Sequence, residues 1–427
     1  MPLRNIQILC LVMFVCVACC IQAERLKYAG KIGNAIWLID QKYVDEVDPK
    51  ELYLAAMEGL VSKLDKNSAF IPPQQYLEFQ EVIEQKFGGI GVLIEGPPTV
   101  KQLTVVSPIR NSPAYKAGML PGDVILEING ESTEDLPATG ATEKMRGLIG
   151  ESVRLKIKHF DALEPVNVTI TRAEIPVDSV FGDRMKPDST WSYFLEEDSR
   201  IAYIRVSLFG ERTVAEFKAA LANVHDQAQA IVIDLRYNPG GILPSAVEMC
   251  DMFLDRGVIV STRGRRGQFS QIRSADSAVS FPLNIPMIVM VNDQSASASE
   301  IMAACLQDAG RAKVAGQRSY GKGTVQQVFD LENDQTALKF TTARFYRPNG
   351  HNIHRIEGMT EEDDWGVTPN AELKLPLNST QELYLQKRWN TRGDPRLASA
   401  KEQPPAPACA GDGQLRLVLH YLQEELK

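Results

Sequence analysis

The feature that most constrains the fold is a regular alternation of apolar and helical segments in the second half of the chain. Three short apolar runs, IAYIRVSL, AIVIDL and PMIVMVN, are each followed by a segment with helical periodicity. Strands that are apolar on both faces and alternate with helices are typical of a parallel sheet covered on both sides. We therefore expect residues 174–375 to form an α/β core built from βαβ units.

Two differently patterned regions precede this core. Residues 24–86 carry apolar side chains at helical spacing, and Asp48 followed by Pro49 indicates the start of a helix. Between residues 87 and 173, short apolar runs separated by Gly, Pro and Asn-Gly turns predict a compact β-rich module. The predicted fold class is therefore α/β with several domains.

The C-terminal region, residues 376–427, differs from the core in composition. It is largely polar and contains the linker QPPAPACAGDG, after which QLRLVLHYLQEEL has the pattern of an amphipathic helix. Such a helix could dock on the body of the protein or on a second subunit.

The N-terminus has the pattern of an export signal. Arg4 precedes an unbroken apolar stretch from Ile8 to Ile21, which is too short to span a bilayer comfortably but suits a signal-peptide core. Cleavage after Ala23 would remove residues 1–23 and place the protein in the periplasm or another extracytoplasmic space. Two alternatives stay open: an uncleaved membrane tether, and lipidation at Cys19 or Cys20.

Charge and cysteine usage argue against several classes of function. A net charge of −8 and a pI near 5.4 disfavour a nucleic-acid or anionic-membrane partner. Outside the N-terminal stretch the cysteines are Cys250, Cys305 and Cys409, which are too few and too far apart for a disulfide framework. No CxxC or His-x-His spacing occurs there, so no metal and no cofactor is expected.

A serine-rich turn, NDQSASASEI, follows the third apolar run. Ser297 and Glu300 have the S-x-x-E spacing of a capping box, which predicts Ser297 as the N-cap of the next helix. That structural role is sufficient by itself. However, a serine at a strand-to-helix turn is also exposed, and the helix N-terminus offers free N–H groups to a developing oxyanion. This geometry singles out Ser297 as the candidate nucleophile among the three serines.

A nucleophilic serine needs a base, and no pattern ties any of the five histidines to Ser297. Lys322 stands between two glycines that let the backbone pack closely. To accept a proton near neutral pH, this lysine would need a pKa lowered from about 10.4 towards 7, which burial can supply at about 1.4 kcal/mol per unit. The ordinary alternative is an exposed loop lysine.

The same stretch raises a nucleotide-binding alternative. Gly316, Gly321 and Lys322 have nearly the spacing of a phosphate-binding P-loop, but Gly323 replaces the Ser or Thr that would hold magnesium. The following residues, TVQQVFDL, predict a strand where a P-loop requires a helix. The sequence therefore disfavours a nucleotide enzyme.

Several segments together resemble the carboxyl-terminal processing (tail-specific) proteases. LRYNPGGIL, SASASEI and YGKGTVQQV occur in the order found in that family, and MEGLVSKLDKNSAF resembles the stretch that precedes its PDZ domain. SPAYKAGMLPGDVILEING resembles the PDZ domain itself. The resemblance covers most of residues 40–370. It implies a PDZ domain at residues 87–173 and a serine protease core of the ClpP/crotonase-like type at residues 174–375.

The resemblance implies catalytic roles for individual residues. Ser297 matches the nucleophile and Lys322 the general base, and Gln326 matches the residue that orients the lysine in several members. On a continuous strand, Gln326 would lie on the same side as Lys322. Asp308 matches, less closely, an acidic residue implicated in some members; otherwise it is a charge at a helix end. The oxyanion donors would be the N–H groups of Gly241 and Ala298.

The PDZ-like module would select the substrate and, as the resemblance implies, gate the active site. The loop that would bind the free C-terminal carboxylate of a substrate comprises Gly89, Ile90, Gly91 and Val92. The substrate tail would then add as a strand beside residues 92–95. Met145 and Leu148 would wall the pocket for the last side chain, unless they belong to the core of the module.

The sequence departs from the family pattern at two positions, Lys66 and Asn370, where relatives have Pro and Asp. Neither change removes a catalytic group. We therefore expect an exported serine endopeptidase that recognises protein substrates by free, apolar C-termini. The alternative is a catalytically silent PDZ scaffold that only binds peptides. Homo-oligomer formation stays open.

Overall fold

The computed structural model describes most of the chain beyond the N-terminal stretch. The predicted signal peptide except residue 13, the linker residues 403–410 with Cys409, and the lipidation alternatives Cys19 and Cys20 lie outside the described residues. Within them, no helix has the length and apolar character needed to cross a membrane. The described residues are 13, 27–97, 101–109, 111–159, 162–276, 279, 281–331, 335–393 and 411–427.

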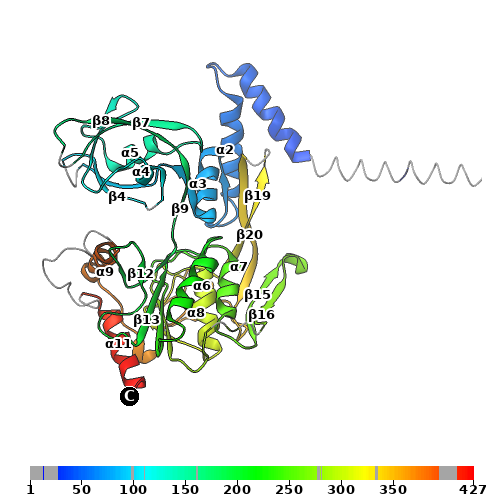
Figure 1. The fold of residues 1–427 in the computed structure, drawn as a ribbon. Helices are drawn as coiled ribbons and strands as arrows, with labels where there is room; N and C mark the ends of the chain where they lie inside the picture. The colour runs from blue at the N-terminus through cyan, green and yellow to red at the C-terminus, as the bar shows by residue number, and fades with distance from the viewer. Residues whose placement is uncertain are drawn as a thin grey trace, which may run out of the picture. The chain divides into compact units, whose positions relative to one another are not determined.

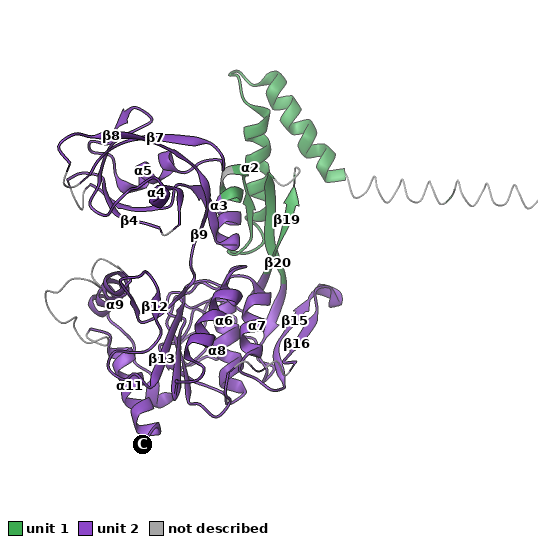
Figure 2. Cartoon of the chain, viewed as in Figure 1, with its two compact units in different colours: residues 1–77, 326–342 green, residues 78–325, 343–427 purple. Residues whose placement is uncertain are grey.

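The chain divides into two compact units (Figure 2). One comprises residues 1–77 and 326–342, and the other comprises residues 78–325 and 343–427. The short segment 326–342 lies inside the range predicted for the α/β core, yet it folds with the N-terminal region.

The first unit combines helices with a small antiparallel sheet. Residues 27–42 form a helix, and α2 (Pro49–Val61) follows with Asp48 as its N-cap, as predicted. The Asp48 side chain accepts a hydrogen bond from the Lys50 N–H at 2.8 Å. Strand β1 (Ala69–Ile71) and strand β19 (Thr324–Leu331) both pair with β20 (Thr336–Tyr346). Helix α3 spans Pro73–Glu84, so the division between the two units, after Leu77, falls within this helix.

The β-rich module has the predicted strand-and-turn organisation. Five strands are ordered β3-β4-β5-β7-β8, and every neighbouring pair is antiparallel. Its core includes the buried residues Ile90, Val105, Met145 and Ile157. The elements are β2 (Lys86–Gly89), β3 (Val92–Glu95), β4 (Thr104–Pro108), α4 (Pro113–Lys116), β5 (Val124–Ile128), β6 (Glu131–Ser132), α5 (Ala138–Met145), β7 (Ser152–Lys158), β8 (Val166–Thr171) and β9 (Ala173–Pro176), the last paired with β2.

The α/β core confirms the prediction made from the alternating pattern. Its sheet has the order β10-β13-β14-β17-β18, and the four strands β13, β14, β17 and β18 are parallel. Three helices, α6, α7 and α8, lie near these strands in Figure 1 and supply side chains to one large apolar cluster. The elements are β10 (Val180–Phe181), β13 (Ile201–Val206), α6 (Thr213–Val224), β14 (Ala230–Asp234), α7 (Leu243–Asp251), β17 (Met287–Val291), α8 (Ala298–Asp308) and β18 (Lys313–Gly316).

The opposite face of the same sheet is covered by the C-terminal helix α11 (Gly413–Glu425). Leu415, Val418 and Leu422 are fully buried there against Tyr203 and Val232. The sequence left two partners open for this helix, and the structure docks it on the body of the core. The three-layer arrangement of helices, sheet and helix gives every apolar strand a covered face on both sides.

The remaining elements of the second unit lie around this sandwich. A three-stranded antiparallel arrangement joins β15 (Val258–Gly264) to β16 (Gln271–Ser274) and to the second half of β20. The others are β11 (Arg184–Met185), β12 (Trp191–Ser192), the short 3₁₀ helices Arg265–Gly267 and Ala371–Leu373, and α9 (Ser379–Arg392).

Candidate active site

Three loops of the predicted site leave the same edge of the core sheet. The glycine loop (residues 235–242) follows β14, the serine-rich turn follows β17, and the lysine loop (residues 317–323) follows β18. These strands are adjacent and parallel, so their carboxyl ends lie side by side. In open α/β sheets this edge is where ligands bind.

The environment of the three serines separates their roles. Ser295 is buried and its hydroxyl donates to the carbonyl of Leu235 at 2.8 Å. Ser299 is also buried and its hydroxyl donates to the carbonyl of Asn238 at 2.9 Å. Both hydroxyls therefore hold the turn against the glycine loop. Ser297 alone is half-buried, between buried neighbours, as a nucleophile that must meet a substrate requires.

Ser297 has a strained backbone. It is the N-cap of α8, as predicted, with φ 55° and ψ −111°. A non-glycine residue rarely adopts such angles, and they persist only where the surrounding contacts enforce them. The helix begins at the next residue, Ala298, whose N–H belongs to the first turn and has no acceptor within the helix.

The glycine loop packs directly on this turn. A side-chain carbon on Gly240 would come within 2.7 Å of the carbonyl oxygen of Ala296 and within 2.9 Å of the Ala298 nitrogen. Gly240 has φ 102°, so only glycine suits both the conformation and the space. The next residue, Gly241, forms a parallel bridge with Phe209.

The bridge leaves one N–H of the loop available. Phe209 donates its N–H to the carbonyl of Gly240 at 2.9 Å, and Ile242 donates to the carbonyl of Phe209 at 2.7 Å. These two hydrogen bonds use no N–H of Gly241. The N–H groups of Gly241 and Ala298 therefore come from two backbone segments that touch through Gly240, which suits a pair of oxyanion donors.

A buried carboxylate ties the serine turn to the lysine loop. Glu300 Oε2 accepts the N–H of Ser297 at 2.8 Å and the N–H of Lys322 at 2.8 Å. The two backbone nitrogens are thus at most twice that distance apart. Glu300 Oε1 accepts the Ser319 hydroxyl at 2.5 Å and the Gly321 N–H at 2.6 Å. Burial raises the pKa of the Glu300 carboxyl above its ordinary value, although these four hydrogen bonds act in the opposite sense.

Lys322 is half-buried between two buried glycines. A side-chain carbon on Gly321 would come within 2.8 Å of Arg355, and one on Gly323 within 2.6 Å of the His354 nitrogen. The close packing predicted for these glycines is therefore present. Strand β19 follows at Thr324, where a P-loop would continue as a helix, so the nucleotide-binding alternative lacks its essential element.

The resemblance also implies roles for Gln326 and Asp308, whose side chains have the following contacts. Gln326 is on β19 and donates its side-chain amide to Thr341 Oγ1 at 3.1 Å. Because β19 begins only at Thr324, the strand alternation used to relate Gln326 to Lys322 does not reach the lysine. Asp308 ends α8 and binds Arg347 through two hydrogen bonds. The length of α8 places it roughly 15 Å along the helix from Ala298, so the structure does not bring it to Ser297.

In the β-rich module, the loop predicted to bind a carboxylate has its carbonyls occupied. The carbonyl of Ile90 accepts the Ala114 N–H at 2.8 Å, and that of Gly91 accepts the Ile109 N–H at 2.9 Å. The N–H and C=O of a trans peptide point in opposite directions, so the N–H groups of Gly91 and Val92 face away from these donors. Gly89 pairs with β9 as the last residue of β2.

The two predicted pocket walls differ in exposure. Met145 is buried in the core of the module, and Leu148 is 71% exposed. Their role in binding a tail side chain stays a prediction.

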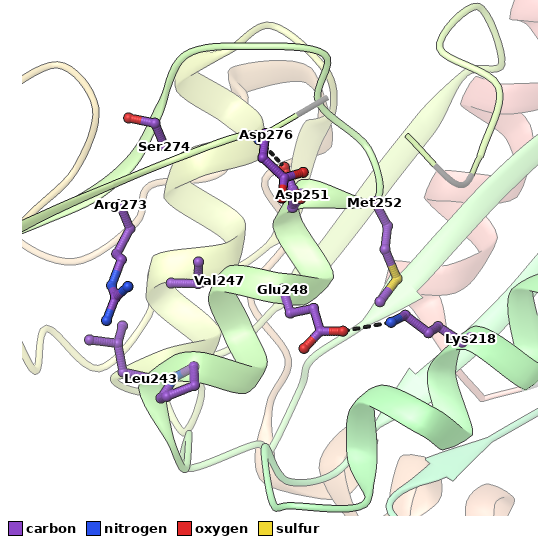
Figure 3. Close-up of a pocket in the computed structure, with 10 residues that line it drawn as sticks. Lys218, Leu243, Val247, Glu248, Asp251, Met252, Arg273, Ser274 and Asp276 are labelled. Carbon is purple, nitrogen blue, oxygen red and sulfur yellow. Dashed lines mark hydrogen bonds and ion pairs between the residues drawn. The ribbon is translucent and has the colours of Figure 1, made fainter. Parts of the chain in front are cut away.

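A separate pocket of about 470 Å³ lies beside α7 (Figure 3) and contains none of the candidate catalytic residues. Two of its charged side chains, Lys218 and Glu248, form an ion pair. Lys218 points to Glu248 at 2.6 Å, and Asp251 accepts the Asp276 N–H at 2.8 Å. We assign it no role in the chemistry.

Sequence reasoning missed the central role of Glu300. The S-x-x-E pattern indicated a capping residue, and the Ser297 N–H does bind this carboxylate. The contacts with Ser319, Gly321 and Lys322 come from a loop about twenty positions later, which no local pattern specifies.

Glu300→Gln tests this anchor. The amide nitrogen of glutamine accepts no hydrogen bond, so backbone donors that now meet a carboxylate oxygen would face another donor. We expect a loss of about 2 kcal/mol in the free energy of unfolding, since each unsatisfied buried donor costs roughly 1–3 kcal/mol. We also expect at least a roughly tenfold lower kcat, because the serine and lysine backbones lose their shared acceptor.

The matched control for this substitution is Glu248→Gln, the same chemical change at a side chain that is 52% exposed. Urea unfolding and steady-state kinetics would be measured on both variants. Equal behaviour of the two would show that Glu300 is an ordinary helix cap.

Comparison with known proteins gives relatives for most of the chain. The profile of peptidase family S41 matches residues 200–373, and that of the PDZ domain matches residues 104–159. A carboxy-terminal-processing protease of Bartonella bacilliformis is 33% identical over 368 residues, 85% of this chain and 79% of that protein. The carboxy-terminal processing protease CtpB of Bacillus subtilis is 34% identical over 360 residues, 83% of this chain and 69% of the relative. Among solved structures, a photosystem II D1 C-terminal processing protease aligns with 87% of this chain and 97% of its own, with a TM-score of 0.43 and 24% identity.

Proposed function

Because this chain belongs to peptidase family S41, the carboxy-terminal processing serine peptidases, and carries a PDZ domain, we propose that Ser297 is its nucleophile and Lys322 its general base. The observation that carries this proposal is the shared anchor, in which one oxygen of Glu300 accepts the backbone N–H groups of both residues. It supports a Ser-Lys pair held in fixed register at the ligand-binding edge of the sheet.

In the proposed reaction, the neutral amine of Lys322 removes the Ser297 hydroxyl proton as Oγ attacks a substrate carbonyl. The N–H groups of Gly241 and Ala298 stabilise the tetrahedral oxyanion. The lysine then passes the proton to the leaving amine, the C–N bond breaks, and an ester links Ser297 to the substrate. Water, deprotonated by the same lysine, attacks this ester and releases the new carboxylic acid and the free serine.

The PDZ domain is proposed to bind the free C-terminal carboxylate of a protein substrate. The N–H groups of Gly91 and Val92, which point away from the Ala114 and Ile109 donors, support this role, as does the edge strand β3, which pairs only with β4 in the described sheet. The exposed side chain of Leu148 favours substrates whose last residue is apolar. Gating of the active site by the PDZ domain is part of the same proposal.

Export to the periplasm or another extracytoplasmic space is proposed from the apolar stretch between Ile8 and Ile21. The N-terminal mass of the protein recovered from its native compartment tests it. A chain that begins at residue 24 supports export with cleavage, and an intact Met1 in the cytoplasmic fraction contradicts it.

An unstructured protein substrate with an apolar C-terminus tests tail recognition. Its free carboxylate form should be cleaved with a kcat/KM roughly 10- to 100-fold higher than the otherwise identical C-terminal amide, because charge-assisted hydrogen bonds contribute about 1.5–3 kcal/mol. The difference should lie mainly in KM. New N-termini would be identified by mass spectrometry.

The scaffold alternative predicts a different result. A protein that only binds peptides would retain the carboxylate form more tightly than the amide and generate no new N-terminus from either. Equal cleavage of both forms would instead keep the peptidase and remove the PDZ domain from substrate selection.

A further inference from the structure

A cluster of positive charge lies in a chain of negative net charge. Residues 256–275 contain five arginines and no Lys, Asp or Glu, whereas the whole chain has a net charge of −8. This segment forms β15, the short 3₁₀ turn Arg265–Gly267 and β16. In Figure 1 the turn of this hairpin projects away from the core helices of the same unit. The net charge is an average that conceals this local excess.

Strand register places two arginines against each other. Arg263 of β15 pairs directly with Arg344 of β20, and both side chains are exposed. Like charges directly opposite one another in an antiparallel pair are destabilising. The Arg263 guanidinium also stacks on the ring of Tyr346, 4.3 Å from its centroid, which keeps it on this face of the strands.

The charges on this surface lack counter-ions among the described residues. Arg265 and Arg266 are exposed in the turn, and Arg266 has φ 55°. Among the residues that the structure describes, no carboxylate lies within 4.0 Å of Arg263, Arg265, Arg266 or Arg344. The arginine ion pairs that the structure describes in this unit are formed by other arginines. We call these four residues the arginine surface.

Apolar side chains accompany the arginine surface. Ile272 of β16 is 71% exposed and pairs with Ser261, which shares a face with Arg263. Phe269, in the hairpin turn, is 42% exposed. Exposed apolar side chains next to unpaired arginines are typical of segments that rest in the boundary between lipid headgroups and acyl chains.

We propose that the arginine surface is a docking site for a bilayer that contains anionic phospholipids. The arginines bind headgroup phosphates, and Phe269 and Ile272 enter the boundary region below them. The uncompensated Arg263–Arg344 pair gains its missing counter-ions on this surface. An acidic protein segment would satisfy the charges but gives no reason for the two exposed apolar side chains, Phe269 in the turn and Ile272 in β16. The proposal is independent of the proposed catalytic residues.

The test uses the full-length protein with sedimented vesicles of phosphatidylglycerol and phosphatidylcholine, beside vesicles of phosphatidylcholine alone. The apolar N-terminal stretch gives every variant the same charge-independent background, so the measured quantity is the excess binding to anionic vesicles. Arg265→Gln with Arg266→Gln should weaken this excess about 30-fold, since each arginine near an anionic surface contributes roughly fivefold. Phe269→Ser should weaken it without changing its dependence on salt.

The matched control removes the same charge elsewhere, through Arg154→Gln with Arg416→Gln, both exposed and outside residues 256–275 and the arginine surface. It should bind anionic vesicles as the parent does. Equal anionic binding by the Arg265/Arg266 variant and the parent would overturn the proposal. A second result would also overturn it: the parent shows no preference for anionic vesicles but binds soluble poly-glutamate, and the Arg265/Arg266 variant loses that poly-glutamate binding. This result would assign the surface to an acidic protein partner.

Discussion

Ser297→Ala is expected to abolish cleavage of a tail-bearing substrate while leaving the fold and tail binding intact. Loss of the nucleophile removes the covalent step and lowers kcat by roughly 10⁶-fold in a well-studied serine peptidase. The exchange removes only a half-buried hydroxyl, and the glycine loop is held by Ser295 and Ser299. Single-turnover cleavage and tail-peptide affinity would be measured on the same preparation.

The neighbouring serines supply the contrast for this experiment. Ser295→Ala and Ser299→Ala remove buried hydrogen bonds to the glycine loop, so each should cost stability and some activity, and neither should abolish turnover. A Ser297→Ala protein that still generated new N-termini at the parental rate would rule out Ser297 as the nucleophile.

The base is tested by Lys322→Ala and Lys322→Arg. Both should be nearly as inactive as Ser297→Ala, because arginine keeps the positive charge but does not release its proton in proteins. Lys63→Ala, at an exposed position in the turn after α2, serves as the control for a lost lysine. Parental activity in Lys322→Arg would show that the residue contributes only charge.

The candidate site could be predicted from sequence to the extent that its parts are local. The capping pattern distinguishes Ser297 from Ser295 and Ser299, because it specifies which serine begins the helix. The pattern of apolar strands specifies the sheet edge at which this turn lies. The sequence predicts close packing at Gly321 and Gly323, because glycine has no side chain and the widest backbone conformational freedom. These inferences need only a few neighbouring residues.

The contacts that hold the site together could not be predicted in the same way. Glu300 binds a loop about twenty residues later, and Arg236 binds Asp412, which lies 176 residues later in the sequence. The resemblance pairs Asp308 with an acidic residue implicated in some family members, and no local pattern predicts that its carboxylate binds Arg347. Pairing of charges across such separations depends on the assembled fold. The positive charge of the β15–β16 hairpin was not predicted either, because the net charge of the whole chain is negative.

Asp412→Ala is expected to produce a large loss of stability. Its carboxylate binds the Arg236 guanidinium through two hydrogen bonds of 2.9 Å, and both side chains are fully buried. Arg236 also binds Asp234, and Gln414 completes its shell at 3.0 Å. Asp412→Ala leaves Asp234 as the counter-ion of Arg236 but removes two buried charge-assisted hydrogen bonds. At about 1.5–3 kcal/mol for each bond, the expected loss is about 3–6 kcal/mol. Urea unfolding followed by circular dichroism measures the loss.

Activity should fall with stability in this variant. Arg236 comes two residues before Asn238, whose carbonyl accepts the Ala296 N–H at 3.0 Å and the Ser299 hydroxyl. The intervening Tyr237 has φ 59°, a strained conformation that its neighbours must maintain. Loosening Arg236 therefore disturbs the loop that supplies Gly241, so kcat should fall under conditions where the protein is still folded. Glu424→Ala, at an exposed carboxylate of the same helix, should change neither quantity by more than about 0.5 kcal/mol or twofold.

The pH dependence separates the charge of Asp412 from its packing. Burial alone would raise the pKa of Asp412, but the charge and hydrogen bonds of Arg236 outweigh it and hold the pKa below the ordinary 3.8. A carboxyl with a depressed pKa stabilises the fold fully above its unfolded value, and that contribution is lost as the pH falls through the folded value. The difference between parent and Asp412→Ala should therefore be constant at neutral pH and shrink below about pH 4. A difference that persists unchanged into acid would mean that side-chain packing, and not the ion pair with Arg236, fastens the C-terminal helix to the core.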